Sequence, residues 1–306
     1  MAPAPHFIIN PAAAAGRARR WWRAAEPVLR KHFPCMSAAV SDTGHPLAAL
    51  LARAVAEGHD FIVGVGGDGT HHDLVNALVA QNLLSRIIYA PLPLGSGNDW
   101  CRTLGLPRHI LRWIEAIKTG RTIDHRIGKI TYSHRAGPQV QHFINVAGLA
   151  YDAEVVRRSG TLPLRHRWMY PFLTLAYLKN FSPSELELRY DNHLVTGRFH
   201  TVNLGIGRYN GGGMRLVPQA DPTADTLALT FALNLPTGRI IANGWRFYTD
   251  TIGSVAGVTT THARSVTVTG ATQVEADGEW LGTAPVTVEL ISQKLRVVCG
   301  STVSFG

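Results

Sequence analysis

Residues 61–76 read Phe-Ile-Val-Gly-Val-Gly-Gly-Asp-Gly-Thr-His-His-Asp-Leu-Val-Asn, and they decide the predicted fold of the N-terminal part. The first five are apolar and rich in β-branched side chains, which is typical of a strand buried on both faces. Three glycines follow within four residues, and Leu74, Val75 and Leu78 then recur at helical spacing. We expect a strand, a tight turn and a helix with Thr70 as its N-cap. The free N–H groups of such a helix start would face a phosphate.

Asp68 lies inside this glycine turn and makes a functional loop the better interpretation. The alternative is a tight turn without a ligand, since glycines mark turns in many α/β proteins. A carboxylate within a phosphate-binding turn is unfavourable unless a cation or a transferable proton accompanies it. The loop matches neither the Walker A pattern nor the G-x-G-x-x-G pattern of dinucleotide-binding proteins.

A second glycine turn follows a second predicted strand. The apolar stretch Ile87–Leu94 runs into Gly95-Ser96-Gly97-Asn98-Asp99. In a parallel sheet, turns of this kind gather at the carboxyl edge of the strands. A further strand at His6–Asn10 ends in Asn10-Pro11 and the small-residue loop Ala12–Gly16, which alone favours an ordinary strand-to-helix connection. Two glycine loops at one sheet edge indicate a ligand site.

The composition is that of a globular protein with an excess of positive charge. The chain has 306 residues, 45% hydrophobic and 17% charged, with 30 Lys and Arg against 21 Asp and Glu. This excess favours anionic partners, although charge alone does not choose among nucleic acid, lipid headgroups and nucleotides. Three cysteines without a C-x-x-C pair argue against a disulfide framework or a zinc site. With no signal-peptide pattern and no apolar run of about 18 residues, we expect a cytoplasmic protein whose membrane contact is peripheral.

The residue pattern changes near residue 127, where short runs of alternating apolar and polar residues replace apolar residues at helical spacing. We predict strands at 127–132, 142–146, 186–190, 193–205, 226–233, 265–269, 272–276, 286–290 and 295–298, with helical insertions at 168–180 and 238–256. The predicted fold is a three-layer α/β domain with a parallel sheet over 1–126 and a β-sandwich domain with helical insertions over 127–292. The tail at about 293–306 is a segment that can return to the first domain.

Six motifs in order along nearly the whole chain resemble those of the diacylglycerol kinase catalytic-domain family, which is related to sphingosine kinases and NAD kinases. They are Asn10-Pro11 with Gly16, Gly66–Thr70 with Asp73 and Asn76, Pro93–Asp99, Phe143–Asp152, Tyr209–Pro218, and Asp277-Gly278-Glu279. One such motif would be weak evidence, whereas six in the same order are strong evidence.

The resemblance implies an ATP-dependent lipid kinase with Mg²⁺, and it assigns residues to the nucleotide and to catalysis. The implied nucleotide contacts are Asn10, Pro11, Thr43, Gly66, Gly67, Asp68, Gly69, Thr70, Gly95, Ser96, Gly97, Asn98, Asp99 and Glu279. The implied catalytic residues are Asp277, as the general base, and Asp68. An Asp on a turn is by itself more often a turn-former, and the sequence does not separate a base from a positioning group.

The resemblance also implies a structural Mg²⁺ near residues 220–227. Asp225 and the main-chain oxygen of Leu227 match the family's pattern, and Asp221 is a substitute ligand. Ala224 and Thr226 stand where the pattern has Asp and Gly. A hard cation needs several oxygen ligands, so these departures weaken the predicted site.

For the acceptor we expect the hydroxyl of a membrane lipid, with diacylglycerol first and a sphingoid base or phosphatidylglycerol as alternatives. The aromatic stretch 162–177 is either core or lipid pocket, and the basic residues beside it would suit an anionic membrane surface. The rival functions are an NAD kinase and a catalytically inactive nucleotide-binding sensor. We expect no nucleic-acid partner, because no such motif accompanies the charge, and a homodimer is left open.

Overall fold

The computed structural model describes residues 4–159, 176–178, 180–301, 303 and 305. The chain forms two compact units. Unit 1 comprises Met1–His125 with Gln293–Phe305, and unit 2 comprises Arg126–Ser292. In the described part of the chain, no helix is both long and apolar enough to cross a bilayer.

A mostly parallel sheet forms the centre of unit 1. Its strands, in spatial order, are β2 (Ser37–Val40), β1 (His6–Ile9), β3 (Phe61–Gly66), β4 (Ile88–Pro93), β16 (Leu295–Val298) and β5 (Thr122–His125). All neighbours are parallel except β5, which runs antiparallel to β16. Strand β3 is buried along its whole length, as its unbroken apolar sequence predicts for a central parallel strand.

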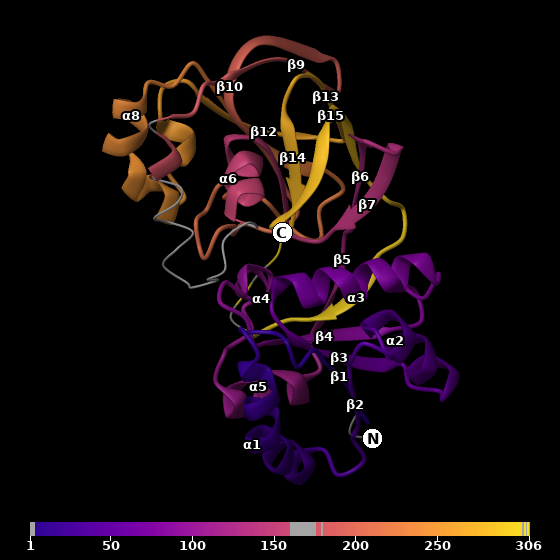
Figure 1. Cartoon of the computed structure of the whole chain (residues 1–306). Helices are drawn as coiled ribbons and strands as arrows, with labels where there is room; N and C mark the ends of the chain where they lie inside the picture. The colour runs from indigo at the N-terminus through magenta and orange to yellow at the C-terminus, as the bar shows by residue number, and fades with distance from the viewer. Residues whose placement is uncertain (1–3, 160–175, 179, 302, 304, 306) are drawn as a thin grey trace. The chain divides into compact units, whose positions relative to one another are not determined.

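Helices cover both faces of this sheet. They are α1 (Arg17–His32), α2 (Leu47–Ala56), α3 (Asp68–Ala80), α4 (Asp99–Thr103) and α5 (Ile110–Thr119). Helices α1 and α5 pack together on one face, and α2 packs beside α3 on the other (Figure 1). The three-layer parallel α/β fold predicted for this part of the chain is confirmed.

Helix α1 shows why these layers hold together. Trp22, Ala25 and Leu29 recur at helical spacing and are buried, while the intervening arginines are exposed. The Trp22 ring lies against Phe7 of β1, with ring centroids 5.4 Å apart. Each such large apolar side chain stabilises the fold by about 1.5–3 kcal/mol when it is fully buried.

Unit 2 is built from antiparallel strands. They are β6 (Gly128–His134), β7 (Gly137–Phe143), β8 (Val146–Ala150), β9 (Ser184–Tyr190), β10 (His193–Gly205), β11 (Leu227–Leu233), β12 (Val258–Ala263), β13 (Ser265–Gly270), β14 (Gln273–Ala276) and β15 (Glu279–Leu290). The predicted β-rich second domain is therefore confirmed. The long strand β10 pairs β9 along its first half, and β8 and β11 along its second half. Because β9 pairs both β13 and β10, the path β10-β8-β14-β15-β13-β9 closes on itself, and β11-β12 and β6-β7 are branches of it.

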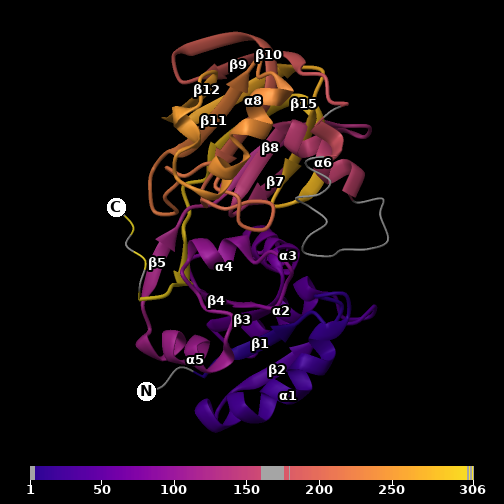
Figure 2. The same ribbon diagram turned by 90° about the vertical axis from the view of Figure 1, so that its left-hand side faces the viewer.

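The helices of unit 2 lie outside these strands (Figure 2). Helix α6 (Tyr151–Ser159) packs against β8 and β14. The helical insertion predicted at 238–256 is broken into α8 (Thr237–Ala242) and the 3₁₀ turns η1 (Gly244–Tyr248) and η2 (Ile252–Ser254). Of the insertion predicted at 168–180, residues 176–178 are helical, and 160–175 and 179 lie outside the described residues.

Several element predictions were wrong in detail. The strand predicted at 142–146 spans the end of β7, a turn at Ile144-Asn145 and the start of β8. The backbone N–H groups of that turn bind the side chain of Asp277 instead of a neighbouring strand. Strands β5 and β12 and helix α6 were not predicted, because their short or mixed sequences lack a clear period.

Candidate functional site

The carboxyl edge of the parallel sheet gathers the predicted nucleotide loops. Asn10 follows β1, Thr43 follows β2, Gly67 follows β3 and Gly95 follows β4. Strand β1 lies between β2 and β3, so the connections from β1 and β3 diverge to opposite sides. In open α/β sheets, ligands bind at such a switch point.

The first glycine loop leads directly into helix α3. The helix begins at Asp68, with Gly67 in an extended conformation as its N-cap, so the prediction of Thr70 as N-cap was wrong. Thr70 instead lies in the first helical turn, and its hydroxyl accepts a hydrogen bond from the Asn10 side-chain amide at 3.0 Å. The start of a helix directs its first backbone N–H groups, and the positive end of its dipole, toward a bound anion.

The two glycine loops touch each other through their backbones. The Leu94 N–H donates to the Gly66 carbonyl at 2.7 Å. A Cβ on Gly67 would lie 3.1 Å from the Gly95 Cα, and a Cβ on Gly95 would lie 2.6 Å from the Gly67 Cα. Side chains at these two positions would push the loops apart, so glycine is required for this close approach.

The second loop is fixed by its own side chains. Asn98 has a left-handed backbone with φ of 54°, and its side-chain oxygen accepts the Gly95 N–H at 2.7 Å. Its amide nitrogen donates to the Gly95 carbonyl at 3.0 Å. Arg108 donates to the carbonyls of Gly95 and Ser96 at 2.6 and 3.1 Å. Asn98, which the resemblance assigns to the nucleotide, thus has a clear structural role in shaping the loop.

Two carboxylates face the glycine loops. The Oδ2 atoms of Asp68 and Asp99 lie 3.0 and 3.5 Å from the position that a Cβ on Gly97 would take. Asp68 accepts the Trp100 N–H at 3.2 Å, and Asp99 pairs with Arg102 at 2.9 Å. Backbone donors beside paired carboxylates fit a phosphate group that is accompanied by a cation.

The loop after β1 completes this edge. Ala14, Ala15 and Gly16 have consecutive positive φ angles of 54°, 58° and 81°, a left-handed conformation that is unfavourable for the two alanines because of their Cβ atoms. The Asn10 side-chain oxygen accepts the Ala12 N–H at 3.0 Å, just after Pro11. Thr43 is exposed in a loop that Asp42 orders by accepting backbone N–H groups. Thr43 thus lies at the carboxyl edge of the sheet, where the predicted nucleotide loops gather.

A buried cluster beneath these loops was not predicted from the sequence. His71 of α3 hydrogen-bonds Tyr89 of β4 at 2.9 Å, and the Trp100 indole donates to His125 at 2.9 Å. Gly64 leaves room for Tyr89, because a Cβ there would lie 2.0 Å from the phenol oxygen. Burial lowers the pKa of His71 from 6.5 to about 3, so its imidazole is neutral. The sequence signal for this cluster is the pair His71-His72 directly after the glycine loop, and that pair does not identify its partners.

In unit 2, Asp277 occupies the turn between β14 and β15 with φ of 51°. Its two carboxylate oxygens accept the backbone N–H groups of Ile144 and Asn145 at 3.0 and 2.9 Å. Its own N–H donates to the Val146 carbonyl at 2.9 Å. These three bonds fix the orientation of the Asp277 carboxylate. The neighbouring Glu279 is exposed at the start of β15.

The residues predicted to bind a structural Mg²⁺ have other partners. Asp225 forms an ion pair with Arg126. Asp221 accepts the Thr223 N–H and hydroxyl at 2.7 and 2.6 Å, and Leu227 lies within β11. Among the described residues, no group of three or more His, Cys, Asp and Glu side chains is arranged to hold a metal. A cation here would compete with Arg126 for Asp225.

Unit 2 also contains an apolar cavity of about 350 Å³. Helix α6, strands β10 and β11 and the segment from α8 to Val258 line it. Its polar lining includes Asp152, His200 and Thr201. Asp152 accepts hydrogen bonds from the Thr201 hydroxyl and the Asn203 amide, and burial raises the pKa of its carboxyl. The lipid pocket suggested at 162–177 falls largely outside the described residues, although Leu178 lines this cavity.

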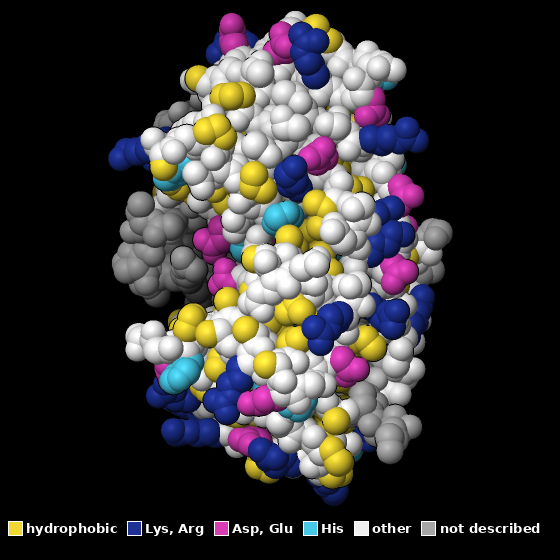
Figure 3. All heavy atoms as spheres, turned by 90° about the vertical axis from the view of Figure 1, so that its right-hand side faces the viewer, with side chains coloured by type: hydrophobic (Ala, Val, Ile, Leu, Met, Phe, Trp, Pro, Cys, Tyr) yellow, Lys and Arg dark blue, Asp and Glu magenta, His cyan; other side chains and the backbone are white. Residues whose placement is uncertain are grey.

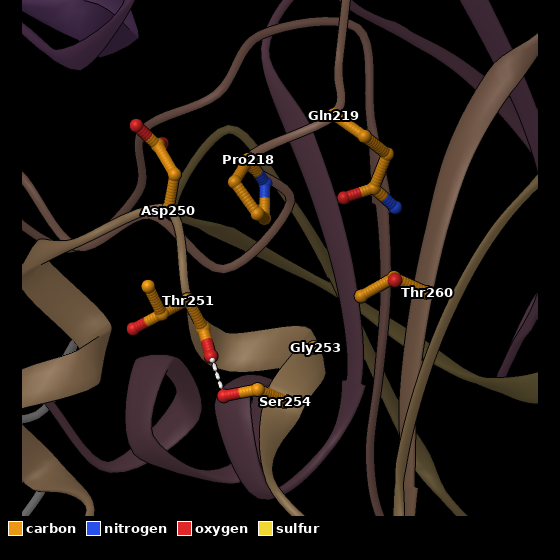
Figure 4. A pocket seen from close by; sticks show the side chains of 7 residues that line it. All are labelled: Pro218, Gln219, Asp250, Thr251, Gly253, Ser254 and Thr260. Carbon is orange, nitrogen blue, oxygen red and sulfur yellow. Dashed lines mark hydrogen bonds between the residues drawn. The ribbon is translucent and has the colours of Figure 1, made fainter.

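A second, more open pocket of about 470 Å³ lies between β12 and the loop before η2. Figure 4 shows Gln219 pointing toward Thr260, with Asp250 on the other side of the opening. Asp250 pairs with Arg215 at 2.5 Å. None of the residues predicted to act in catalysis lines this pocket.

Comparison with known families decides the relationship. Residues 5–130 match the diacylglycerol kinase catalytic domain, and residues 145–299 match the YegS C-terminal NAD kinase beta sandwich-like domain. The chain belongs to the diacylglycerol kinase family. As a member of this lipid kinase family it is a phosphotransferase, and kinase chemistry implies the use of ATP.

Individual relatives cover nearly the whole chain. A Bacillus subtilis protein named "Putative lipid kinase YtlR" is 26% identical over 313 residues, covering 95% of this chain and 98% of that protein. A Mycobacterium tuberculosis diacylglycerol kinase is 27% identical over 271 residues, covering 85% and 83%. The crystal structure of "a putative diacylglycerol kinase" from Bacillus anthracis has a TM-score of 0.77 at 20% identity, covering 98% of both chains. At 20% identity, this similarity shows only that the two chains share a fold.

Proposed function

We propose that this protein transfers the γ-phosphate of ATP to the hydroxyl of a membrane glycerolipid such as diacylglycerol. The observation that carries the acceptor assignment is the apolar cavity of unit 2, whose walls suit a hydrocarbon chain. The names of the relatives, lipid kinase and diacylglycerol kinase, agree with it. A polar acceptor such as a dinucleotide would leave these apolar walls without a function.

The nucleotide side of the proposal rests on unit 1. The Gly66–Thr70 loop leads into the start of α3, where backbone N–H groups point toward an anion, and Gly67 and Gly95 let the two loops approach closely. Mg²⁺ bound with ATP would offset the phosphate charge, and we assign Asp68 and Asp99, whose carboxylates lie beside Gly97, to hold it. Asn10 and Thr70 fix the relative position of the loops after β1 and β3.

Asp277 is the residue that we assign to the acceptor hydroxyl. Two backbone N–H groups bind its carboxylate and fix its direction. A loose phosphoryl-transfer transition state needs little early proton removal, so orientation of the hydroxyl is as important as basicity. Asp277 would accept the hydroxyl proton as the acceptor oxygen bonds to the γ-phosphorus and the bond from that phosphorus to the bridging oxygen breaks, which releases ADP.

Access to a membrane lipid requires attachment to a bilayer surface. The net charge of +9 would favour an anionic surface. On the face shown in Figure 3, Lys and Arg side chains are dispersed, with Asp and Glu among them. We therefore propose weak, salt-sensitive attachment. The fraction of protein that sediments with anionic vesicles should decrease as the salt concentration rises. Binding that does not change with salt concentration would contradict this electrostatic attachment.

The decisive experiment incubates the protein with labelled ATP, Mg²⁺ and a panel of lipids in mixed micelles, with NAD in a parallel reaction. We expect label in a glycerolipid. Label in NAD alone would overturn the lipid assignment in favour of an NAD kinase. ATP binding without label in any acceptor would favour a nucleotide-binding sensor.

A further inference from the structure

One buried histidine in the wall of the unit 2 cavity has no hydrogen-bond partner among the described residues. His200 is 5% exposed, and neither of its ring nitrogens has a hydrogen-bond partner in the structure described for residues 4–159, 176–178 and 180–301. Buried polar groups are nearly always paired, because leaving one unpaired carries its full desolvation cost. The nearby Asp152 and Thr201 side chains hydrogen-bond each other. The ring nitrogens of His200 therefore face a molecule that enters the cavity.

A bulge in strand β10 turns His200 toward the cavity. The pairing of β10 with β11 shifts between Phe199 and Thr201, which leaves His200 as the extra residue. Successive side chains of a regular strand point to opposite faces, yet His200 and Thr201 both line the cavity. Bulges commonly redirect a side chain beside a functional site, and this one presents an imidazole to the cavity.

Aromatic neighbours hold the imidazole in place. The ring of Tyr151 is tilted at 34° to His200 with centroids 5.1 Å apart, and Phe181 meets it edge-on at 5.2 Å. Burial lowers the pKa of His200 from 6.5 to about 4, so the ring is neutral near pH 7. A neutral imidazole carries one N–H donor and one acceptor nitrogen. The cavity wall therefore offers a fixed donor without a charge.

The rest of the lining selects a mostly hydrocarbon ligand. Ala232, Ile240, Phe247, Ile252 and Val255 contribute apolar side chains from four segments. A hydrocarbon chain that enters such a cavity carries with it the polar group at the start of the chain. In an acylglycerol that group is the ester carbonyl, an acceptor that a neutral imidazole N–H can bind.

We propose that His200 donates a hydrogen bond to an ester carbonyl of the lipid acceptor, and so determines a preference for acyl esters over ether lipids. This inference rests on the proposed lipid kinase function and extends it to one specificity-determining residue. An ether-linked lipid has the same chains without the carbonyl. It would fill the cavity and leave the His200 N–H unpaired.

The test compares a diacylglycerol with the dialkylglycerol of equal chain length in the same micelles. The wild-type protein should show a kcat/KM about tenfold higher for the ester, the value of one hydrogen bond in a buried site. His200→Phe replaces the imidazole with an aromatic ring that has no donor, so the ester-to-ether ratio of kcat/KM should fall to about one. His200→Gln restores an N–H donor and should recover part of the preference.

His193→Phe is the matched control, since it makes the same change on the same strand where the side chain is exposed. It should keep the wild-type preference. An unchanged ester-to-ether ratio in folded His200→Phe would overturn the inference while the lipid kinase function stands. Failure of the wild-type protein to phosphorylate either lipid would overturn the proposed function and this inference with it.

A second readout does not depend on turnover. Diacylglycerol with ¹³C-labelled carbonyls is bound to Asp277→Asn, and its infrared carbonyl stretch is compared with that in the double variant that also carries His200→Phe. A hydrogen bond from His200 should lower the stretching frequency in the first protein, and the shift should vanish in the second. Identical spectra would contradict the assignment. This measurement also serves if His200→Phe turns over too slowly for kinetics.

Discussion

The glycine loops of unit 1 and the apolar cavity of unit 2 are built in opposite ways. The loops present main-chain groups, and glycines at Gly67 and Gly95 allow them to approach within a few ångströms. The cavity is lined by side chains from α6, β10, β11 and the segment from α8 to Val258. A site made from backbone leaves a compact sequence signature, whereas a cavity assembled from distant segments leaves none. Its chemistry emerges only when those segments are packed.

The largest effect that we expect lies in unit 2. Asp277→Asn should lower kcat by about 10²–10⁴, the usual contribution of a positioned acid–base group. ATP affinity, measured by calorimetry, should stay within about twofold, because the nucleotide loops are in unit 1. Asp250→Asn, which changes a 62% exposed carboxylate of the same unit, is the control and should keep full activity. Near-normal turnover of Asp277→Asn would remove Asp277 from the reaction.

The next prediction tests whether the backbone contact between Gly67 and Gly95 shapes the proposed nucleotide site. In Gly95→Ala the new Cβ would lie 2.6 Å from the Gly67 Cα, so the loops must separate. Overpacking of this kind costs about 1–3 kcal/mol, and ATP affinity should fall about tenfold or more. Gly238→Ala places its Cβ in open space and should leave ATP affinity unchanged. Wild-type affinity in Gly95→Ala would contradict the required close approach.

A third prediction concerns the core beneath the loops. The pKa of His71 is lowered from 6.5 to about 3, so the folded state excludes a proton that the unfolded chain binds. The stability from this group is complete above about pH 6.5 and is lost as the pH falls toward 3. Between pH 7 and pH 5 the free energy of unfolding should decrease by about 2 kcal/mol through His71.

Urea unfolding of the wild-type protein and of His71→Phe at both pH values measures this contribution. The variant loses the bond to Tyr89, so it should be less stable at pH 7, with a smaller decrease toward pH 5. His193→Phe should behave like the wild-type protein. A pH dependence in His71→Phe as steep as in the wild-type protein would show that His71 is not the group responsible.

A fourth prediction concerns a substitution on strand β11 that would fill the apolar cavity of unit 2. Ala232→Phe adds a large ring to the lining on β11 and should raise the KM for diacylglycerol about tenfold, with ATP affinity unchanged. Leu194→Phe, at a 52% exposed position of β10, is the control for the added aromatic ring. An unchanged KM in a folded Ala232→Phe protein would place the lipid elsewhere.

The smallest effect concerns the predicted structural metal. Because Asp225 pairs with Arg126, we expect Asp225→Asn to change the Mg²⁺ dependence of activity by less than about twofold. Asp68→Asn should raise the Mg²⁺ concentration for half-maximal activity well above that, because Asp68 lies at the nucleotide loops. A large Mg²⁺ shift in Asp225→Asn would restore the metal site that the resemblance implied.

The sequence predicted the parallel α/β unit and its two glycine loops well, because buried parallel strands and tight turns have local signals. It missed that α3 begins at Asp68, and that the Thr70 hydroxyl binds the side chain of Asn10, which follows another strand. It also misplaced the strand at 142–146. The turn there exists because Asp277, far along the chain, binds the N–H groups of Ile144 and Asn145.

The sequence by itself determined the parallel α/β character of unit 1, the β-rich character of unit 2 and the residue types available for phosphoryl transfer. These properties follow from hydrophobic period and from the backbone freedom of glycine, which act over a few residues. Only the tertiary structure decided that Asp225 faces Arg126, and that a strand bulge turns His200 into an apolar cavity. Such contacts join residues distant in the chain, and their energies depend on packing that no local pattern records.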